Sequence, residues 1–129
     1  KNLLFLVTVA FFFACSEKGK ICTEEFRMIT VEITNAQNEP VEPDDFYVIK
    51  IQTGDTVFSK NNPAVNDDFS EEIVIFTDNQ MNETDEEAKE FQLNVFKDSK
   101  RIVQENYLIK HDGCHVELVS GKTQIQLPD

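Results

Sequence analysis

Two histidines four positions apart, His111 and His115, are the residues of this chain whose types and spacing come nearest to a metal site. On a helix this spacing would place both imidazoles on one face, where Zn²⁺ could bind them together with Asp112 or Cys114. Gly113 interrupts such a helix, and on strands His111 would end one element while His115 begins the next. We therefore interpret both histidines as ordinary turn and strand residues, and we predict no zinc site.

Oxygen ligands are concentrated between residues 61 and 90, where the sequence has ten acidic residues and one lysine. Carboxylate and amide oxygens are the ligands that Ca²⁺ prefers. The candidate calcium ligands are Asp67, Asp68, Glu71, Glu72, Asp78, Asn82, Glu83 and Asp85. No D-x-[DN]-x-[DN]-G spacing occurs among them, so we interpret this stretch as a solvated acidic surface, with calcium binding as the alternative.

Nucleophilic catalysis has no recognisable constellation in this sequence. No Ser or Cys lies in a nucleophile-elbow pattern, and both histidines are close to Cys114. The chain carries 24 acidic and 12 basic residues, a formal net charge of -12 that repels phosphate backbones. We expect neither an enzyme nor a nucleic-acid-binding protein, and we predict no cofactor.

The amino-terminal residues indicate export. Residues 3–13 form an apolar run between Lys1 and Ala14, which is typical of a signal peptide. The run is shorter than the roughly 20 residues with which a helix crosses a bilayer. Ala14 followed by Cys15 resembles the lipobox of bacterial lipoproteins, in which the cysteine thiol is acylated and the chain is cut before it. The resemblance implies lipidation of Cys15, and the alternative is an ordinary secretory signal.

The lipobox resemblance divides the chain into a signal peptide at residues 1–14, a tether at 15–21 and a folded domain at 22–129. Three acyl chains on Cys15 would anchor the protein permanently, because each buried CH₂ adds about 0.8 kcal/mol of membrane affinity. We expect an outer-membrane lipoprotein that contacts the membrane through this anchor. Residues 16–20 contain one acid and two lysines, which leaves the periplasmic face and the cell surface both open as its location.

Acylation of Cys15 would leave Cys22 and Cys114 as the remaining two thiols of an exported chain. In an oxidising compartment they are candidates for a disulfide that closes a loop of about 90 residues. Such a loop contributes roughly 4 kcal/mol in the chain-entropy description. The alternative is two buried free thiols.

The body of the chain reads as a series of short strands, because apolar residues recur with a period of two after Cys22. Turn residues separate the runs, and Gly54 with Asp55 predicts a hairpin. Thr84–Glu87 has a capping-box pattern, which predicts a turn or two of helix before Phe91. Strands are expected at residues 29–34, 46–51, 56–58, 72–77, 91–96, 101–109, 115–119 and 123–127.

About eight short strands in one domain of 129 residues predict an all-β fold. A single open sheet would leave one of its faces in water, so the strands are expected to form two antiparallel sheets packed face to face. The predicted fold is therefore a two-sheet antiparallel β-sandwich of seven or eight strands.

Several short motifs resemble those of the carboxypeptidase regulatory-domain-like, or transthyretin-like, β-sandwich lipoproteins of Bacteroidetes-type bacteria. These motifs are Cys22, residues 28–41, residues 112–116 and residues 124–127. The resemblance implies a sandwich of seven or eight strands, a bridge from Cys22 to Cys114, and no catalytic residue. Asn38 stands where that family has Gly, and Asn is the other residue that readily adopts a positive φ.

These inferences together predict a lipid-anchored envelope protein whose non-catalytic β-sandwich is a binding or structural module. Its partner is expected to be an unidentified protein or glycan, bound through the loops. One alternative is a small fimbrial or pilin-like subunit, because transthyretin-like sandwiches also occur in lipoprotein pilins. The other is a small enzyme or inhibitor that uses the acidic loops.

Overall fold

The computed structural model describes residues 19–62 and 72–129, which form eight strands and one short 3₁₀ helix. The predicted signal peptide, Cys15 and most of the tether lie outside these residues. The elements are β1 (Met28–Thr34), β2 (Asp45–Lys50), β3 (Thr56–Ser59), β4 (Glu72–Thr77), η1 (Asp78–Glu83), β5 (Lys89–Lys97), β6 (Lys100–His111), β7 (Val116–Ser120) and β8 (Gln124–Gln126).

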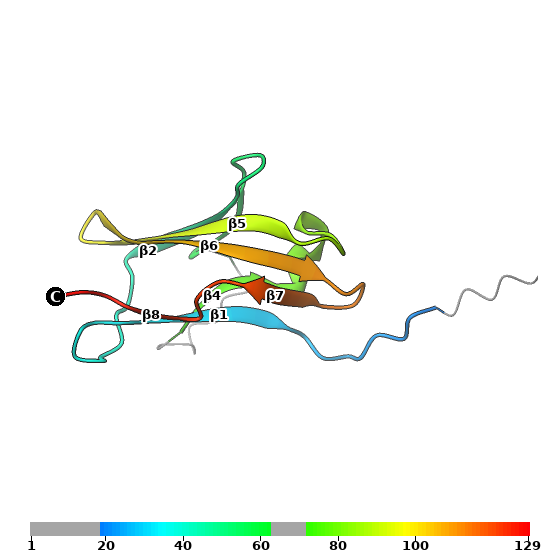
Figure 1. Cartoon of the computed structure of the whole chain (residues 1–129), viewed down its shortest axis with the longest axis horizontal. Helices are drawn as coiled ribbons and strands as arrows, with labels where there is room; N and C mark the ends of the chain where they lie inside the picture. The colour runs from blue at the N-terminus through cyan, green and yellow to red at the C-terminus, as the bar shows by residue number, and fades with distance from the viewer. Residues whose placement is uncertain (1–18, 63–71) are drawn as a thin grey trace, which may run out of the picture.

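The strands form two sheets that lie face to face as two layers (Figure 1). One sheet has the strand order β4-β1-β8, and the other has the order β3-β2-β5-β6-β7. The predicted all-β, two-sheet sandwich is confirmed. The predicted hairpin through Gly54 and Asp55 is also confirmed, because β2 and β3 pair antiparallel.

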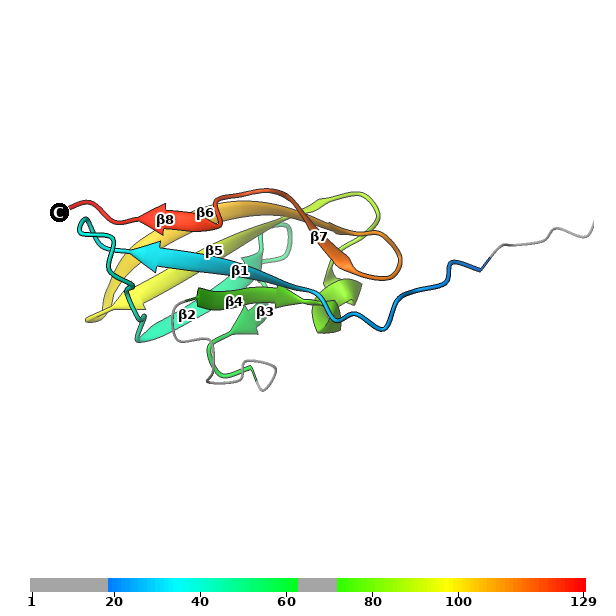
Figure 2. The same ribbon diagram turned by 90° about the horizontal axis from the view of Figure 1, so that it is seen from below.

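One pairing differs from the antiparallel arrangement expected throughout. β8 runs parallel to β1, with Ile125 opposite Ile33. The chain leaves the five-stranded sheet after β7 and crosses to the other layer, so that it enters β8 in the same direction as β1. Figure 2 shows β8 beside the end of β1, while β7 lies near the first half of β1.

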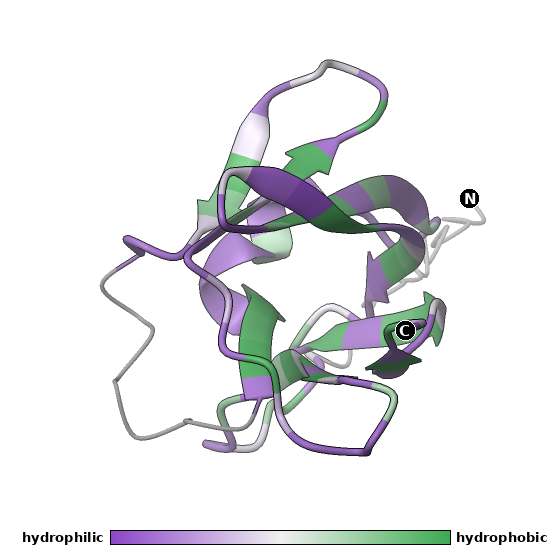
Figure 3. Ribbon diagram, turned by 90° about the vertical axis from the view of Figure 1, so that its left-hand side faces the viewer, coloured by the Kyte–Doolittle hydropathy of each residue, from purple (hydrophilic) through white to green (hydrophobic). Residues whose placement is uncertain are grey.

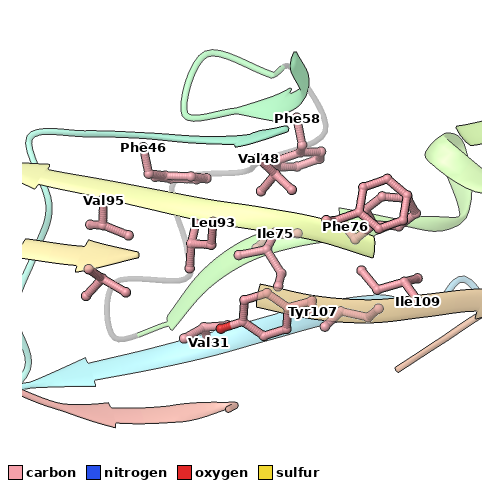
Figure 4. Close-up of a cluster of buried hydrophobic side chains, with 14 of the residues drawn as sticks. Val31, Phe46, Val48, Phe58, Ile75, Phe76, Leu93, Val95, Tyr107 and Ile109 are labelled. Carbon is pink, nitrogen blue, oxygen red and sulfur yellow. The ribbon is translucent and has the colours of Figure 1, made fainter. Parts of the chain in front are cut away.

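In β4 the four consecutive residues 74–77 are buried, whereas the core residues of the other strands mostly alternate along the chain. The alternation follows from the two-residue period of a strand, and Figure 3 shows polar and apolar residues alternating along the strands. The fully buried side chains include Phe76 and Phe91, whose rings meet edge to face with centroids 4.9 Å apart. Figure 4 labels Val31, Phe46, Val48, Phe58, Ile75, Phe76, Leu93, Val95, Tyr107 and Ile109 in this core.

The helix predicted to begin at Thr84 is wrong, because the helix lies earlier in the chain, at η1. Thr77 caps η1: its hydroxyl accepts from the N–H of Asn79, and the Gln80 side chain accepts from the N–H of Thr77. Thr84 is instead the residue that ends η1. Its buried hydroxyl donates to the carbonyl of Ile109 on β6 at 2.6 Å, and the chain runs from Thr84 to β5 without a helix.

Asn38 adopts a φ of 61° in the turn after β1, as its place in the sequence predicted. In the part of the chain that the structure describes, no helix is long and apolar enough to span a bilayer.

Candidate functional site

The disulfide between Cys22 and Cys114 joins the segment before β1 to the turn between β6 and β7. The two Cα atoms are 5.3 Å apart, within the usual range for a bridge. The predicted pairing is confirmed, and the alternative of two buried free thiols is wrong. The bridge brings residues separated by 92 positions to one end of the sandwich.

His115 lies directly before β7, and its side chain is only 7% exposed. Its Nδ1 is 2.8 Å from Oδ2 of Asp78, and its Nε2 is 3.1 Å from the hydroxyl oxygen of Thr23. Both ring nitrogens therefore have protein partners, which satisfies the hydrogen-bonding requirement of a buried imidazole. The contacts tie the segment that carries Thr23 to the start of η1 and to β7.

Asp78, the first residue of η1, receives hydrogen bonds from three directions. The N–H of Arg27 donates to its Oδ2 and the N–H of Val116 donates to its Oδ1, both at 2.8 Å, in addition to the contact with His115. Burial raises the pKa of this carboxyl group, but the three hydrogen bonds together outweigh burial and hold the pKa below its ordinary value. Asp78 is consequently a carboxylate that joins three segments of the chain.

Asp112 organises the turn that carries the disulfide. Its Oδ1 accepts from the N–H groups of Cys114 and His115, each at 2.8 Å. These two hydrogen bonds, with Lys20 nearby, lower the pKa of Asp112 to about 2. Lys20 also donates to the carbonyl of Asp112, and its Nζ is 3.6 Å from Oδ1. We call Thr23, Asp78, Asp112, His115 and the Cys22–Cys114 disulfide the clasp.

The two histidines take part in different hydrogen-bond networks. His111 is the last residue of β6, and its Nδ1 accepts from the N–H of Gly113 at 3.1 Å. His115 is held by Thr23 and Asp78. In residues 19–62 and 72–129, no group of three or more His, Cys, Asp or Glu side chains is arranged to hold a metal ion.

The calcium candidates are distributed over separate interactions. The carboxylate of Asp78 accepts the hydrogen bonds of the clasp. Asp85 accepts from the N–H of Glu86 at 2.8 Å. Glu83 is 3.8 Å from the Nζ of Lys50, and Glu72 and Asn82 are exposed. Asp67, Asp68 and Glu71 lie outside the described residues.

Sequence reasoning missed the contacts of His115. Thr23 and Asp78 lie 92 and 37 positions from it in the chain, and neither belongs to a motif that includes a histidine. The detectable signal was the resemblance that paired Cys22 with Cys114. That bridge places the neighbouring Thr23 and His115 side by side.

A groove of about 710 Å³ lies beside the clasp, between the start of β1 and the edge strand β7. Its lining includes the partly exposed side chains of Phe26 and Met28. The Thr23 hydroxyl, the His115 imidazole and the Asp78 carboxylate contact one another in the order found in a nucleophilic triad. None of these three residues lines the groove.

Comparison with protein-family models, with curated proteins and with solved structures found no match for this chain.

Proposed function

We propose that this protein is a lipid-anchored component of a bacterial envelope, and that its β-sandwich is a non-catalytic binding or structural module. The observation that supports this most is the clasp. It fastens the segment that follows the proposed tether to the end of the folded domain by a covalent bond and several hydrogen bonds.

The position of the clasp suits a tethered domain. Residues 19–27 leave the sandwich at one end, while the C-terminus and the β1–β2 and β5–β6 loops lie at the other end (Figure 1). Because Cys22 is joined to Cys114, a pull on the tether passes to the β6–β7 turn instead of peeling β1 from its sheet. The outer faces of both sheets and the remote loops stay available to a partner in the periplasm or at the cell surface.

Metabolic labelling with alkynyl palmitate tests the anchor in cells that process lipoproteins. The wild-type chain is expected to take up label and Cys15→Ser is expected to take up none. Cys22→Ser is the matched control, since it removes a neighbouring thiol and should retain full labelling. Equal labelling of wild type and Cys15→Ser, or none of either, would contradict the proposal.

Hydrolysis is the competing function, and one observation favours it: the sequence of contacts from the Thr23 hydroxyl through His115 to Asp78. A structural clasp is favoured because His115 is buried and Asp78 already holds two backbone N–H groups. A fluorophosphonate probe and a panel of ester substrates separate the two functions. Labelling or turnover that is lost in Thr23→Ala would establish the hydrolase and end the binding-module proposal.

A further inference from the structure

The outer face of the five-stranded sheet carries a group of uncharged polar side chains. Phe91, Leu93 and Val95 of β5 are buried in the core, so the residues between them are directed to the opposite face of the sheet. We call this group the amide face, and it consists of Tyr47, Ile49, Gln92, Asn94, Gln104 and Asn106.

The register of the sheet arranges the amide face in two neighbouring rows across three strands. One row is Tyr47, Asn94 and Gln104, and the other is Ile49, Gln92 and Asn106. Neither row itself contains a charged residue, and the charged residue that contacts them is Arg101, whose guanidinium reaches Asn94.

Three side-chain hydrogen bonds are made on or beside the amide face, and two of them are long. Gln92 Nε2 donates to Asn106 Oδ1 at 3.0 Å. Two further hydrogen bonds have donor–acceptor distances of 3.4 Å: Asn94 Nδ2 donates to Gln92 Oε1, and Arg101 Nη1 donates to Asn94 Oδ1. Bonds of that length are weak and are readily exchanged for shorter ones. Within residues 19–62 and 72–129 the Gln104 side chain makes no hydrogen bond.

The residues of the amide face differ in their access to a ligand. Gln104 and Asn106 are exposed and Gln92 is half-buried, so their amides can reach a bound molecule. Asn94 is only 2% exposed, so its amide is not open to a ligand, and it contacts Gln92 and Arg101 through the two long hydrogen bonds.

An aromatic ring of fixed orientation adjoins the amides. Tyr47 stacks on Phe96, with ring centroids 5.7 Å apart and an angle of 25° between the planes. Tyr47 is half-buried, so part of its side chain remains on the surface. Such a side chain offers an apolar body and a polar tip to a ligand.

We propose that the amide face binds an uncharged polysaccharide. Amide groups provide a donor and an acceptor side by side, which matches the adjacent hydroxyls of a sugar, and the Tyr47 ring can pack on the apolar C–H groups of a pyranose. The net charge of -12 repels acidic polysaccharides. The inference rests on the proposed function, because an exported binding module is the kind of protein that meets such chains.

The test is affinity electrophoresis of the full-length lipidated chain in a polyoxyethylene detergent, which contains no sugar. The gels contain soluble xyloglucan, yeast mannan, dextran or arabinoxylan as neutral probes and polygalacturonate as the acidic probe. Retardation by at least one neutral probe and none by polygalacturonate is the expected result.

The variant Gln92→Ala with Asn106→Ala is expected to weaken that binding at least tenfold. The matched control, Gln124→Ala with Asn79→Ala, removes one glutamine and one asparagine outside the amide face and should bind like wild type. Thermal unfolding of both variants establishes that they are folded.

No retardation by any neutral probe, or retardation equal in the two double variants, would overturn the inference. Stronger binding to polygalacturonate than to the neutral probes would overturn it as well. The acyl label on Cys15 is a separate readout. If Cys15 carries the acyl label but the protein binds no polysaccharide, this inference fails while the proposed function stands.

Discussion

Asp78 is the residue on which the hydrogen bonds of the clasp converge, since it joins Arg27, His115 and Val116. Its pKa in the folded protein lies below the ordinary value of 3.8. A carboxyl group with a lowered pKa contributes stability that is fully present above the pKa of the unfolded chain and is lost as the pH falls through the folded pKa.

We therefore predict that Asp78→Asn lowers the free energy of unfolding by about 2 kcal/mol at pH 7, the scale of hydrogen bonds to a charged group. The difference from wild type should stay constant down to about pH 5 and shrink below the ordinary carboxyl pKa of 3.8. Urea unfolding between pH 2.5 and pH 7 measures it. Asp85→Asn, at an exposed carboxylate seven positions away, is the matched control and should change the free energy by less than about 0.5 kcal/mol. A difference that grows on acidification would contradict this account of Asp78.

Among individual residues, the sequence predicted a structural role only for those that belong to a recognisable motif. Cys22 and Cys114 were paired through their positions in a family resemblance, and Asn38 was recognised as a residue able to adopt a positive φ. The contact of His115 with Asp78 was not predictable, because it depends on how η1 and β7 meet in space. Asp78 was instead grouped with the other acids by its charge.

The crossing from β7 to β8 depends on the close approach of Gly121 to Tyr107. Gly121 has a φ of +133°, and a Cβ added there would lie 2.2 Å from Cδ1 of the Tyr107 ring. The ring cannot swing aside easily, because Tyr107 is 1% exposed and its hydroxyl donates to the carbonyl of Lys122 at 2.7 Å. Burial, with a smaller contribution from Glu105, raises the pKa of this hydroxyl, so it remains a donor.

We predict that Gly121→Ala destabilises the protein by about 3 kcal/mol, the combined effect of backbone strain and overpacking. Gly54→Ala is the matched control: Gly54 has a φ of +77°, but nothing lies within 4 Å of an added Cβ. It should cost about 1 kcal/mol, from the backbone conformation alone. Thermal unfolding of both variants measures the difference. Equal destabilisation would show that contact with Tyr107 does not matter.

Most of the strands could be predicted because they bury one face, which gives the sequence a period of two. β4 departs from this alternation, because its residues 74–77 are all buried. β4 was predicted with the bounds that the structure has, Glu72–Thr77. The helix was misplaced because Thr84 and Thr77 both begin patterns that can cap a helix. In the structure Thr77 caps the helix, while Thr84 ends it and donates to Ile109 on β6, which is distant in the sequence. The parallel pairing of β8 with β1 was missed because strand periodicity carries no information about direction.

Across the whole molecule, the disulfide is the covalent connection between two residues that lie 92 positions apart in the chain. We predict that the double variant Cys22→Ser with Cys114→Ser has a free energy of unfolding about 4 kcal/mol lower than wild type. Without the bridge, the unfolded chain has a higher conformational entropy, which stabilises the unfolded state. Urea unfolding of the two proteins gives the difference. Thr23→Val is the control, since it removes only the hydroxyl contact with His115 and should cost about 1 kcal/mol. If the double variant were as stable as the control, the clasp would not fasten the tether in the way proposed.

The amide face is a property of the whole sheet, since no single strand contains it. Gln92 and Asn94 alternate with buried Leu93 and Val95 in the sequence, which was a sufficient signal for an outward polar face. Their place beside Asn106 follows only from the register of β5 with β6.

The central claim is that this sandwich is anchored by a lipid at Cys15 and fastened to its anchor by the bridge between Cys22 and Cys114. Peptide mass spectrometry of the protein, recovered from bacterial membranes without reduction, tests it most directly. The account predicts an amino-terminal peptide that begins at an acylated Cys15, together with a linked pair of peptides that contain Cys22 and Cys114. An unmodified Cys15 with free thiols at the other two positions would contradict it.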